Sequence, residues 1–232
     1  MAFSRGPSIV KDGLVLYLDA ANPKSYPGSG TTWSDVSGNG NNGTLTNGPT
    51  FSSANGGSIV FDGVNDRVNL TSSSLIQNLT TNFTFQAYVR FNTSGGQYGI
   101  FTKGTNLVGG WTVYVRQGPQ FSLIGYNDSN ISSGLLAPTP SGGITTNTWY
   151  LVTYTYNQVN VICYINGIQA ASSLYSQTFN STGTTPYIGW DENIGNPDYW
   201  PGNISSVSLY NRALTAEEVL QNYNATKSRF GL

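Results

Sequence analysis

Residues 82–91, NFTFQAYVRF, alternate in polarity in the way that decides the fold class of this chain. Every second position is apolar, namely Phe83, Phe85, Ala87, Val89 and Phe91. A period of two residues is that of a β-strand with one buried face. The segment therefore predicts a strand that lies against a hydrophobic core.

Further strands are predicted on both sides of this segment. β-rich runs that end at Gly, Asn or Pro occupy residues 13–20, 58–63, 67–70, 149–157, 159–165, 186–190 and 203–210. Asn166-Gly167 lies between Ile165 and Ile168, and both turn residues tolerate positive φ. This pair predicts a two-residue hairpin.

A single segment, residues 215–230, has a helical pattern. Thr215 and Glu218 can form a capping box at its start, and its apolar stripe consists of Val219, Leu220 and Tyr223. About a dozen strands joined by turn residues, followed by one short C-terminal helix, predict an all-β, two-sheet antiparallel β-sandwich of the jelly-roll type. We expect an N-terminal arm over residues 1–12 and one domain over 13–232.

Composition narrows the classes of function. Charged residues make up 9% of the chain and the net charge is −1, so binding to nucleic acid through phosphate neutralisation is not expected. No apolar run approaches the ~20 residues of a membrane span, and the first residues lack the apolar core of a signal peptide. We therefore expect synthesis in a cytoplasm. Cys163, the one cysteine, lies among apolar strand residues and is expected to be a buried packing residue.

Three blocks of the sequence resemble the laminin-G/pentraxin-like branch of the concanavalin A-like lectin/glucanase superfamily. They are NFTFQAYVRF (82–91), NTWYLVTYTYNQVNVICYINGIQAAS (147–172) and GNISSVSLYNRALTAEEVLQNY (202–223). The last block is the most specific, because a strand, Asn-Arg-Ala-Leu and a capped helix close such domains. The resemblance covers residues 13–226 and implies a concanavalin A-like jelly roll, but it implies no particular ligand.

The front of the chain adds a narrower resemblance. Residues 13–51, GLVLYLDAANPKSYPGSGTTWSDVSGNGNNGTLTNGPTF, and 58–70, SIVFDGVNDRVNL, look like the first half of such domains in virion proteins of marine and cyanobacterial phages. The chain departs from the family at Ser205-Ser206, where members often have Asp-Glu. If that acidic pair holds a metal or a buried ion pair, the role is missing here.

Catalysis is disfavoured by the inventory of acids and bases. Glucanases of the superfamily carry Glu-x-Asp-x-Glu on one strand, whereas this chain has three Glu, and two of them, Glu217 and Glu218, begin the predicted helix. There is no His for a Ser-His-Asp triad or a His-ligated zinc. A glycoside hydrolase, which needs two carboxylates beside the scissile bond, is the least favoured of three functions.

The stretch WSDVSGNGNNGT (33–44) has the spacing of a calcium loop. Asp35, Ser37 and Asn39 alternate with residues that let the chain wrap, but Thr46 stands where an EF-hand has its bidentate Glu. Two interpretations stay open: a structural turn in which Asp35 and the Asn side chains bond the loop's own amides, which is favoured, or a weak calcium site.

The stretch GWDENIGNPDYWPG (189–202) is the densest cluster of acids and aromatic residues. Aromatic faces stack on sugar rings, while carboxylates and amides bind hydroxyl groups. The candidate carbohydrate-binding residues are Trp190, Asp191, Asn193, Asp198, Tyr199 and Trp200. Asp191 and Glu192 are also candidate calcium ligands. The alternative, which is favoured, is that Trp190 and Trp200 belong to the core.

These observations predict a non-enzymatic structural protein of a phage virion, either a capsid decoration protein or a fibre or knob subunit, localised in the virion. Its expected partners are other virion proteins, further copies of itself in a homo-oligomer, and a host-surface glycan bound weakly at many copies. No cofactor is required, although calcium could bind. The alternative is a carbohydrate-binding module, or lectin, outside a virion.

Overall fold

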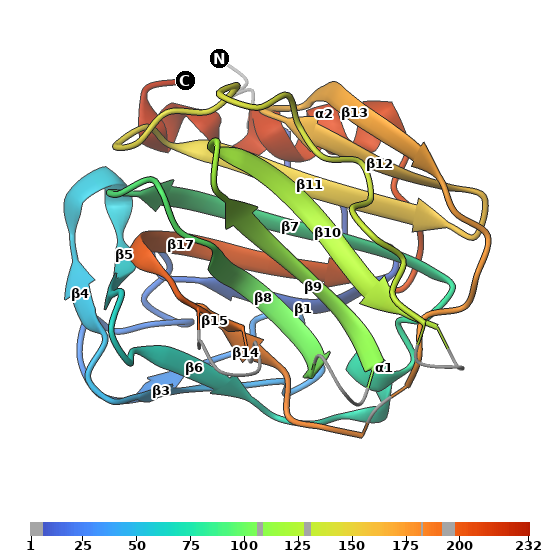
Figure 1. The fold of residues 1–232 in the computed structure, drawn as a ribbon. Helices are drawn as coiled ribbons and strands as arrows, with labels where there is room; N and C mark the ends of the chain where they lie inside the picture. The colour runs from blue at the N-terminus through green and yellow to red at the C-terminus, as the bar shows by residue number, and fades with distance from the viewer. Residues whose placement is uncertain (1–6, 106–108, 128–130, 182, 192–197) are drawn as a thin grey trace, which may run out of the picture.

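Two antiparallel β-sheets pack face to face in the computed structural model, and a C-terminal helix lies outside them (Figure 1). The structure describes residues 7–105, 109–127, 131–181, 183–191 and 198–232. The predicted sandwich of the jelly-roll type is confirmed.

Sheet A has eight strands in the described residues, in the order β13–β12–β11–β7–β17–β5–β4, with β1 also paired to β17. Its strands are β1 (Leu14–Asp19), β4 (Thr50–Ser52), β5 (Ser58–Asp62), β7 (Asn82–Phe91), β11 (Tyr150–Asn157), β12 (Asn160–Ile165), β13 (Ile168–Leu174) and β17 (Pro201–Tyr210). Strands far apart in sequence are thus neighbours, and β7 lies between β11 and β17.

Sheet B has seven strands in the described residues, in the order β10–β9–β8–β14–β6–β3–β2, and a separate two-stranded piece, β15–β16, lies beside it. The strands are β2 (Thr32–Trp33), β3 (Gly43–Thr46), β6 (Arg67–Leu70), β8 (Tyr98–Thr105), β9 (Gly109–Arg116), β10 (Gln120–Tyr126), β14 (Tyr187–Ile188), β15 (Trp190–Asp191) and β16 (Asp198–Tyr199). Short helical turns lie at η1 (Ala54–Gly56) and α1 (Ser74–Gln77).

The main core fills the space between the two sheets. The alternating residues of β7 all contribute to it, as predicted, and the ring of Phe83 stacks on Trp111 of sheet B with centroids 4.4 Å apart. Tyr154 and Cys163 are also fully buried there. Burial raises the pKa of the Cys163 thiol to about 12, which agrees with its expected role as a packing residue.

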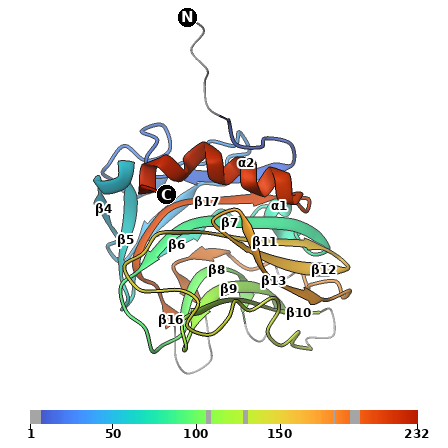
Figure 2. The ribbon, with the colours of Figure 1, turned by 90° about the horizontal axis from the view of Figure 1, so that it is seen from above.

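Helix α2 (Ala216–Thr226), followed by η2 (Lys227–Phe230), covers the outer face of sheet A (Figure 2). The predicted capping box is present: the Glu218 amide donates to Thr215 Oγ1, and the Thr215 amide donates to the Glu218 carboxylate. The predicted apolar stripe is partly wrong, because Leu220 is 43% exposed. Val219, Asn222 and Thr226 are the buried residues of the helix.

Because a helix covers sheet A, strand β7 is buried on both of its faces. Thr84, Gln86 and Tyr88 alternate with the core residues and are buried as well. Tyr88 stacks on Phe230 of η2 with ring centroids 4.1 Å apart. The polar members of the alternation therefore face a second, partly polar layer rather than solvent.

The predicted hairpin at Asn166-Gly167 is confirmed. Both residues have positive φ, 52° and 80°, and Ile165 pairs with Ile168 across the turn. Strand β13, which starts there, forms one edge of sheet A, and an irregularity in its register follows at Cys163/Tyr164 of β12. A bulge of this kind protects an exposed sheet edge from pairing with another chain.

The segment before β1, expected to be an arm, contacts helix α2 in its described part. The Val10 amide donates to Asn222 Oδ1 at 2.7 Å, and the Val10 carbonyl accepts from Tyr210 Oη at 3.0 Å. Gln221 Nε2 donates to the Ser8 carbonyl at 2.8 Å. Val10 is buried in the apolar cluster under the helix, so packing begins before residue 13.

Candidate functional site

The hairpin of β15 and β16 lies on the outer face of sheet B, across strand β8. Gly99 allows this close approach, because a Cβ there would lie only 2.6 Å from the Asp191 backbone nitrogen. Thr102 Oγ1, also on β8, donates to the Trp190 carbonyl at 2.8 Å. These two contacts position the hairpin on the sheet.

Strand alternation separates the aromatic residues of the hairpin from its acids. Trp190 pairs with Tyr199, and Asp191 pairs with Asp198. Both aromatic side chains are partly exposed, whereas the two aspartates are 2% and 5% exposed. The cluster that the sequence places together is therefore divided between the outside of the hairpin and its underside.

Trp190 is the centre of an aromatic platform, by which we mean Arg67, Tyr187, Trp190 and Tyr199. Its ring stacks on Tyr199 with centroids 6.2 Å apart and meets the edge of Tyr187 at 4.5 Å. The Arg67 guanidinium lies 5.4 Å from the Trp190 ring centroid, a cation–π contact. All four side chains are partly exposed.

Sequence reasoning missed Arg67 and Tyr187. Both stand on strands of sheet B, and no local pattern distinguishes them from other outward-facing residues. Arg67 Nε donates to Asn69 Oδ1 at 3.0 Å, which holds the guanidinium in place. Pairing of Tyr187 with Asn69 across β14 and β6 brings the two strands together beside the hairpin.

Asp191 faces two threonines of sheet B. Asp191 Oδ1 lies 3.4 Å from both Thr102 Oγ1 and Thr112 Oγ1. Burial raises the pKa of nearby Tyr114 to about 12; Arg116 lowers it, and Asp191 raises it further. Asp191 therefore lies between the hairpin and sheet B rather than beside the exposed rings.

Trp200 belongs to the core. It is fully buried, and its ring meets Phe91 edge to face with centroids 6.1 Å apart. This is the alternative that the sequence left open for Trp200, and it removes that ring from any surface a sugar could reach. Glu192 and Asn193, the remaining candidates, lie outside the described residues.

The loop of residues 33–44 is organised by Asp35. Its Oδ1 accepts from the amides of Tyr17 and Ser37, both at 2.9 Å. Its Oδ2 accepts from the Asn41 amide at 2.9 Å and from Ser37 Oγ at 2.8 Å. This geometry is that of the structural turn, the favoured one of the two interpretations.

The asparagines of the same loop cover an open edge of β1. Asn39 Nδ2 and Asn41 Nδ2 both donate to the Val15 carbonyl, at 3.1 and 2.9 Å. Side-chain amides thus satisfy backbone groups that no neighbouring strand reaches. Across the described part of the chain, no group of three or more His, Cys, Asp or Glu side chains converges as metal ligands would.

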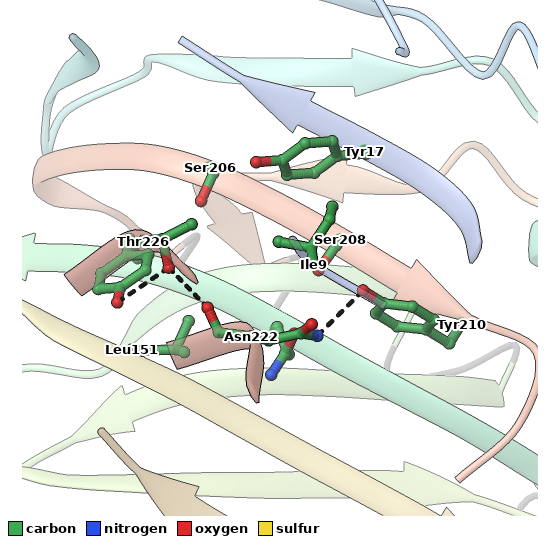
Figure 3. A pocket seen from close by; sticks show the side chains of 10 residues that line it. Ile9, Tyr17, Leu151, Ser206, Ser208, Tyr210, Asn222 and Thr226 are labelled. Atoms are coloured by element: carbon green, nitrogen blue, oxygen red, sulfur yellow. Dashed lines mark hydrogen bonds between the residues drawn. The ribbon is translucent and has the colours of Figure 1, made fainter. Parts of the chain in front are cut away.

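A small polar cavity of about 20 Å³ lies between helix α2 and sheet A (Figure 3). Asn222, Thr226, Tyr210 and Gln86 line it, and Asn222 Nδ2 donates to Tyr210 Oη at 3.0 Å and to Gln86 Oε1 at 2.7 Å. That volume suffices for an ordered water. Burial raises the pKa of Tyr210 to about 12.

Ser206, one of the two serines that replace the acidic pair of the family, also lines this cavity. Its cross-strand partner is Asp19. Asp19 accepts two hydrogen bonds from the Arg229 guanidinium, at 2.8 and 2.9 Å. Burial opposes the charge of Arg229, but this pairing outweighs it and raises the pKa. A buried carboxylate is therefore present, on β1 instead of β17.

Comparison with protein families shows to which superfamily this chain belongs. A model described as the concanavalin A-like lectin/glucanases superfamily matches residues 61–220, more than half of the 232 residues. The chain belongs to this superfamily. The resemblance noted in the sequence is thereby confirmed at the level of the superfamily. No curated protein matches the chain.

Solved structures of toxin binding domains share this fold. The binding domain of Paraclostridial Mosquitocidal Protein 1 superposes with a TM-score of 0.71 at 19% identity, covering 93% of this chain and 52% of that one. The botulinum neurotoxin serotype D ligand-binding domain in complex with N-acetylneuraminic acid gives 0.70 at 18% identity, covering 92% and 51%.

A third structure is the botulinum neurotoxin DC binding domain in complex with rat synaptotagmin II. Its TM-score is 0.70 at 15% identity, with 94% of this chain and 52% of that one covered. This chain thus spans about half the length of the solved structures it matches. Among the helices of the described residues, none has the length and apolar character to cross a bilayer.

Proposed function

We propose that this protein is a non-enzymatic, lectin-like binding module that recognises a surface glycan through the aromatic platform. The observation that carries this proposal is the exposure of Trp190 and Tyr199 beside Arg67 and Tyr187 on the outer face of sheet B. Aromatic faces of this kind bind the apolar faces of sugar rings, and Arg67 adds a hydrogen-bond donor.

The solved relatives support this class of function. The botulinum neurotoxin serotype D ligand-binding domain was solved in complex with N-acetylneuraminic acid, and the cell entry of botulinum neurotoxin type C depends on interaction with two ganglioside molecules. Glycan binding is therefore compatible with this fold. Whether a given sandwich binds a glycan depends on the side chains on its surface. Single-site affinity should be weak, near ~1 mM, and useful when many copies act together.

The setting that we propose for this module is a phage particle, as a decoration, fibre or knob subunit in several copies. The support is the resemblance of residues 13–51 and 58–70 to phage virion domains. Mass spectrometry of purified particles tests this part separately. Absence of the chain from particles would leave the lectin outside a virion as the function.

The experiment for glycan binding compares Trp190→Ala with Tyr223→Ala on a glycan array, each as a multimerised full chain. Trp190 lies on the platform, whereas Tyr223 is a partly buried aromatic residue of helix α2 on the opposite side of the sandwich (Figure 2). We expect Trp190→Ala to lose at least about tenfold in apparent affinity, because stacked aromatic contacts contribute ~1 kcal/mol each and multivalency multiplies the loss.

Equal binding by both variants would contradict the platform. Thermal unfolding of each variant distinguishes a lost contact from a lost fold. Turnover of a polysaccharide that disappears in Asp191→Asn would contradict the non-enzymatic part of the proposal, since Asp191 is a buried carboxylate that could serve as one of a catalytic pair.

A further inference from the structure

A cleft of about 400 Å³ lies far from the aromatic platform, between the N-terminal segment, β1 and the loops at residues 22–24 and 36–37. It is lined by Ile9, Lys11, Leu14, Tyr17, Asn22, Lys24, Val36 and Ser37. Its volume falls in the range of about 300–1,000 Å³ that is typical of small-molecule sites. Ile9 and Tyr17 also line the small cavity of Figure 3, so the two hollows are neighbours.

Each wall of the cleft is held by contacts of its own. Two hydrogen bonds fix the N-terminal segment: the Val10 amide donates to Asn222 Oδ1, and Tyr210 Oη donates to the Val10 carbonyl. The Asp35 carboxylate holds the loop that contains Val36 and Ser37. On the floor, Tyr17 Oη donates to Asp19 Oδ2 at 3.0 Å, which orients its ring. The cleft is therefore preformed, and a ligand would not have to order it.

Two of the side chains that line the cleft, Lys11 and Lys24, carry a positive charge. Lys11 and Lys24 are exposed, and within the described residues neither makes an ion pair. Two arginines of the described residues do have carboxylate partners: Arg212 pairs with Asp12 and Glu218, and Arg229 pairs with Asp19. Both lysines that line the cleft are thus available to pair with a charged group of a ligand.

The carboxylates near the cleft do not neutralise these lysines by direct pairing. Asp12 and Asp19 are bound by arginines. The two oxygens of Asp35 accept four hydrogen bonds from the loop and from β1. A ligand that carries its own negative charge can therefore pair with these two lysines directly.

The remaining lining combines apolar and polar groups. Ile9, Leu14, Val36 and the ring of Tyr17 offer apolar surface, while Asn22 and Ser37 offer hydrogen-bonding groups. A sugar ring has an apolar face of C–H groups and an edge of hydroxyls, so it matches both. We propose that this cleft is a second binding site, separate from the aromatic platform, for a single anionic sugar unit that bears a carboxylate or a sulfate between Lys11 and Lys24.

The test is an NMR titration of the ¹⁵N-labelled full chain with glucuronic acid, glucose 6-sulfate, glucose and acetate. We expect the two acidic sugars to shift the amides of Tyr17, Asn22 and Val36 at concentrations where glucose and acetate do not. Binding should weaken as salt is raised, because exposed charges are screened over about 10 Å at 0.1 M. Which acidic sugar binds more tightly identifies the anionic group.

Variants of the lysines locate the site. Lys11→Gln and Lys24→Gln should each weaken binding of the acidic sugar by about fivefold, the upper range for an exposed ion pair. Lys227→Gln, which removes the same charge from a lysine that stacks on Tyr223, should leave it unchanged. Trp190→Ala should also leave it unchanged, so that failure of the platform and failure of this cleft are distinguishable.

Three results would overturn the proposal. One is that neither acidic sugar shifts these amides. Another is that glucose or acetate shifts them as strongly as glucuronic acid, which would remove the need for a charged sugar. The third is that Lys11→Gln and Lys24→Gln bind like the wild type, which would place the anionic group elsewhere.

Discussion

At the scale of single residues, Lys103 shows how an amine can be retained in the interior of this sandwich. It is fully buried on β8, opposite Trp111, and its Nζ donates to the Asn180 carbonyl at 3.2 Å. Burial lowers its pKa to about 8, from the ordinary value of 10.5. Below pH 8 the folded protein therefore carries a cation that is poorly solvated.

We predict that Lys103→Met raises the free energy of unfolding at pH 7, by about 1–3 kcal/mol, because the cost of burying the charge disappears. In the wild type the unfolded chain binds more protons than the folded chain between pH 8 and 10.5. Stability should therefore rise with pH in that window, and the rise should be absent in Lys103→Met.

Urea unfolding at pH 7.0, 8.5 and 9.5 measures both effects. This range stops below pH 10, because the raised pKa values of buried tyrosines such as Tyr88 and Tyr210 lower stability at higher pH. Lys24→Met, at an exposed lysine, is the control and should show no change in pH dependence. Identical pH profiles for wild type and Lys103→Met would show that Lys103 does not titrate in this window.

At the scale of elements, the structure shows what joins helix α2 to the sandwich. Asn222 bonds three separate parts of the chain: Val10 of the N-terminal segment, Gln86 of β7 and Tyr210 of β17. The side chain is 3% exposed. A buried amide with all of these partners gives the helix a unique position, which apolar contact alone would not specify.

We predict that Asn222→Ala lowers the free energy of unfolding by about 2–4 kcal/mol, since it leaves the Val10 amide and the Gln86 amide oxygen without this partner. The matched control is Asn224→Ala, two residues along the same helix and exposed, which should change stability by less than about 0.5 kcal/mol. Chemical denaturation measures both. Similar values for the two variants would mean that water replaces the Asn222 contacts at no cost.

At the scale of the whole molecule, three layers replace the two of a plain sandwich. The outer face of sheet A carries Tyr88, Leu151, Tyr164 and Tyr210, which α2 and η2 cover. The outer face of sheet B instead carries the aromatic platform. The outer face of sheet A is therefore buried and stabilises the fold, whereas the outer face of sheet B remains available for binding.

We predict that deleting residues 215–232 causes aggregation, because the apolar outer face of sheet A becomes a large exposed patch. Size-exclusion chromatography and binding of a hydrophobic dye measure this. Deleting only residues 227–232 should have a smaller effect, since Val219 and Asn222 keep α2 in place while Phe230 is lost from Tyr88 and Trp149. A monomeric, equally stable 1–214 chain would contradict this packing.

Local patterns in the sequence were enough to predict the strands, the hairpin and the helix. The alternation of 82–91, the positive φ of Asn166-Gly167 and the capping box at Thr215 each depend on residues within a few positions of one another. Interactions of that range are encoded in spacing, so they can be recognised without the fold. The organising role of Asp35 in its turn belongs to the same group.

Tertiary structure alone decided which side chains of the 189–202 cluster reach the surface. The sequence places Trp190, Asp191 and Trp200 close together, but in the structure Asp191 is buried under the hairpin and Trp200 is buried in the core. Arg67 and Tyr187 lie in the platform because β6 and β14 pair in sheet B. Lys11 and Lys24 line the same cleft because the N-terminal segment packs against helix α2, which is distant in the sequence. The physical reason is that burial and proximity between distant segments depend on sheet register and layer packing, which no short stretch of sequence contains.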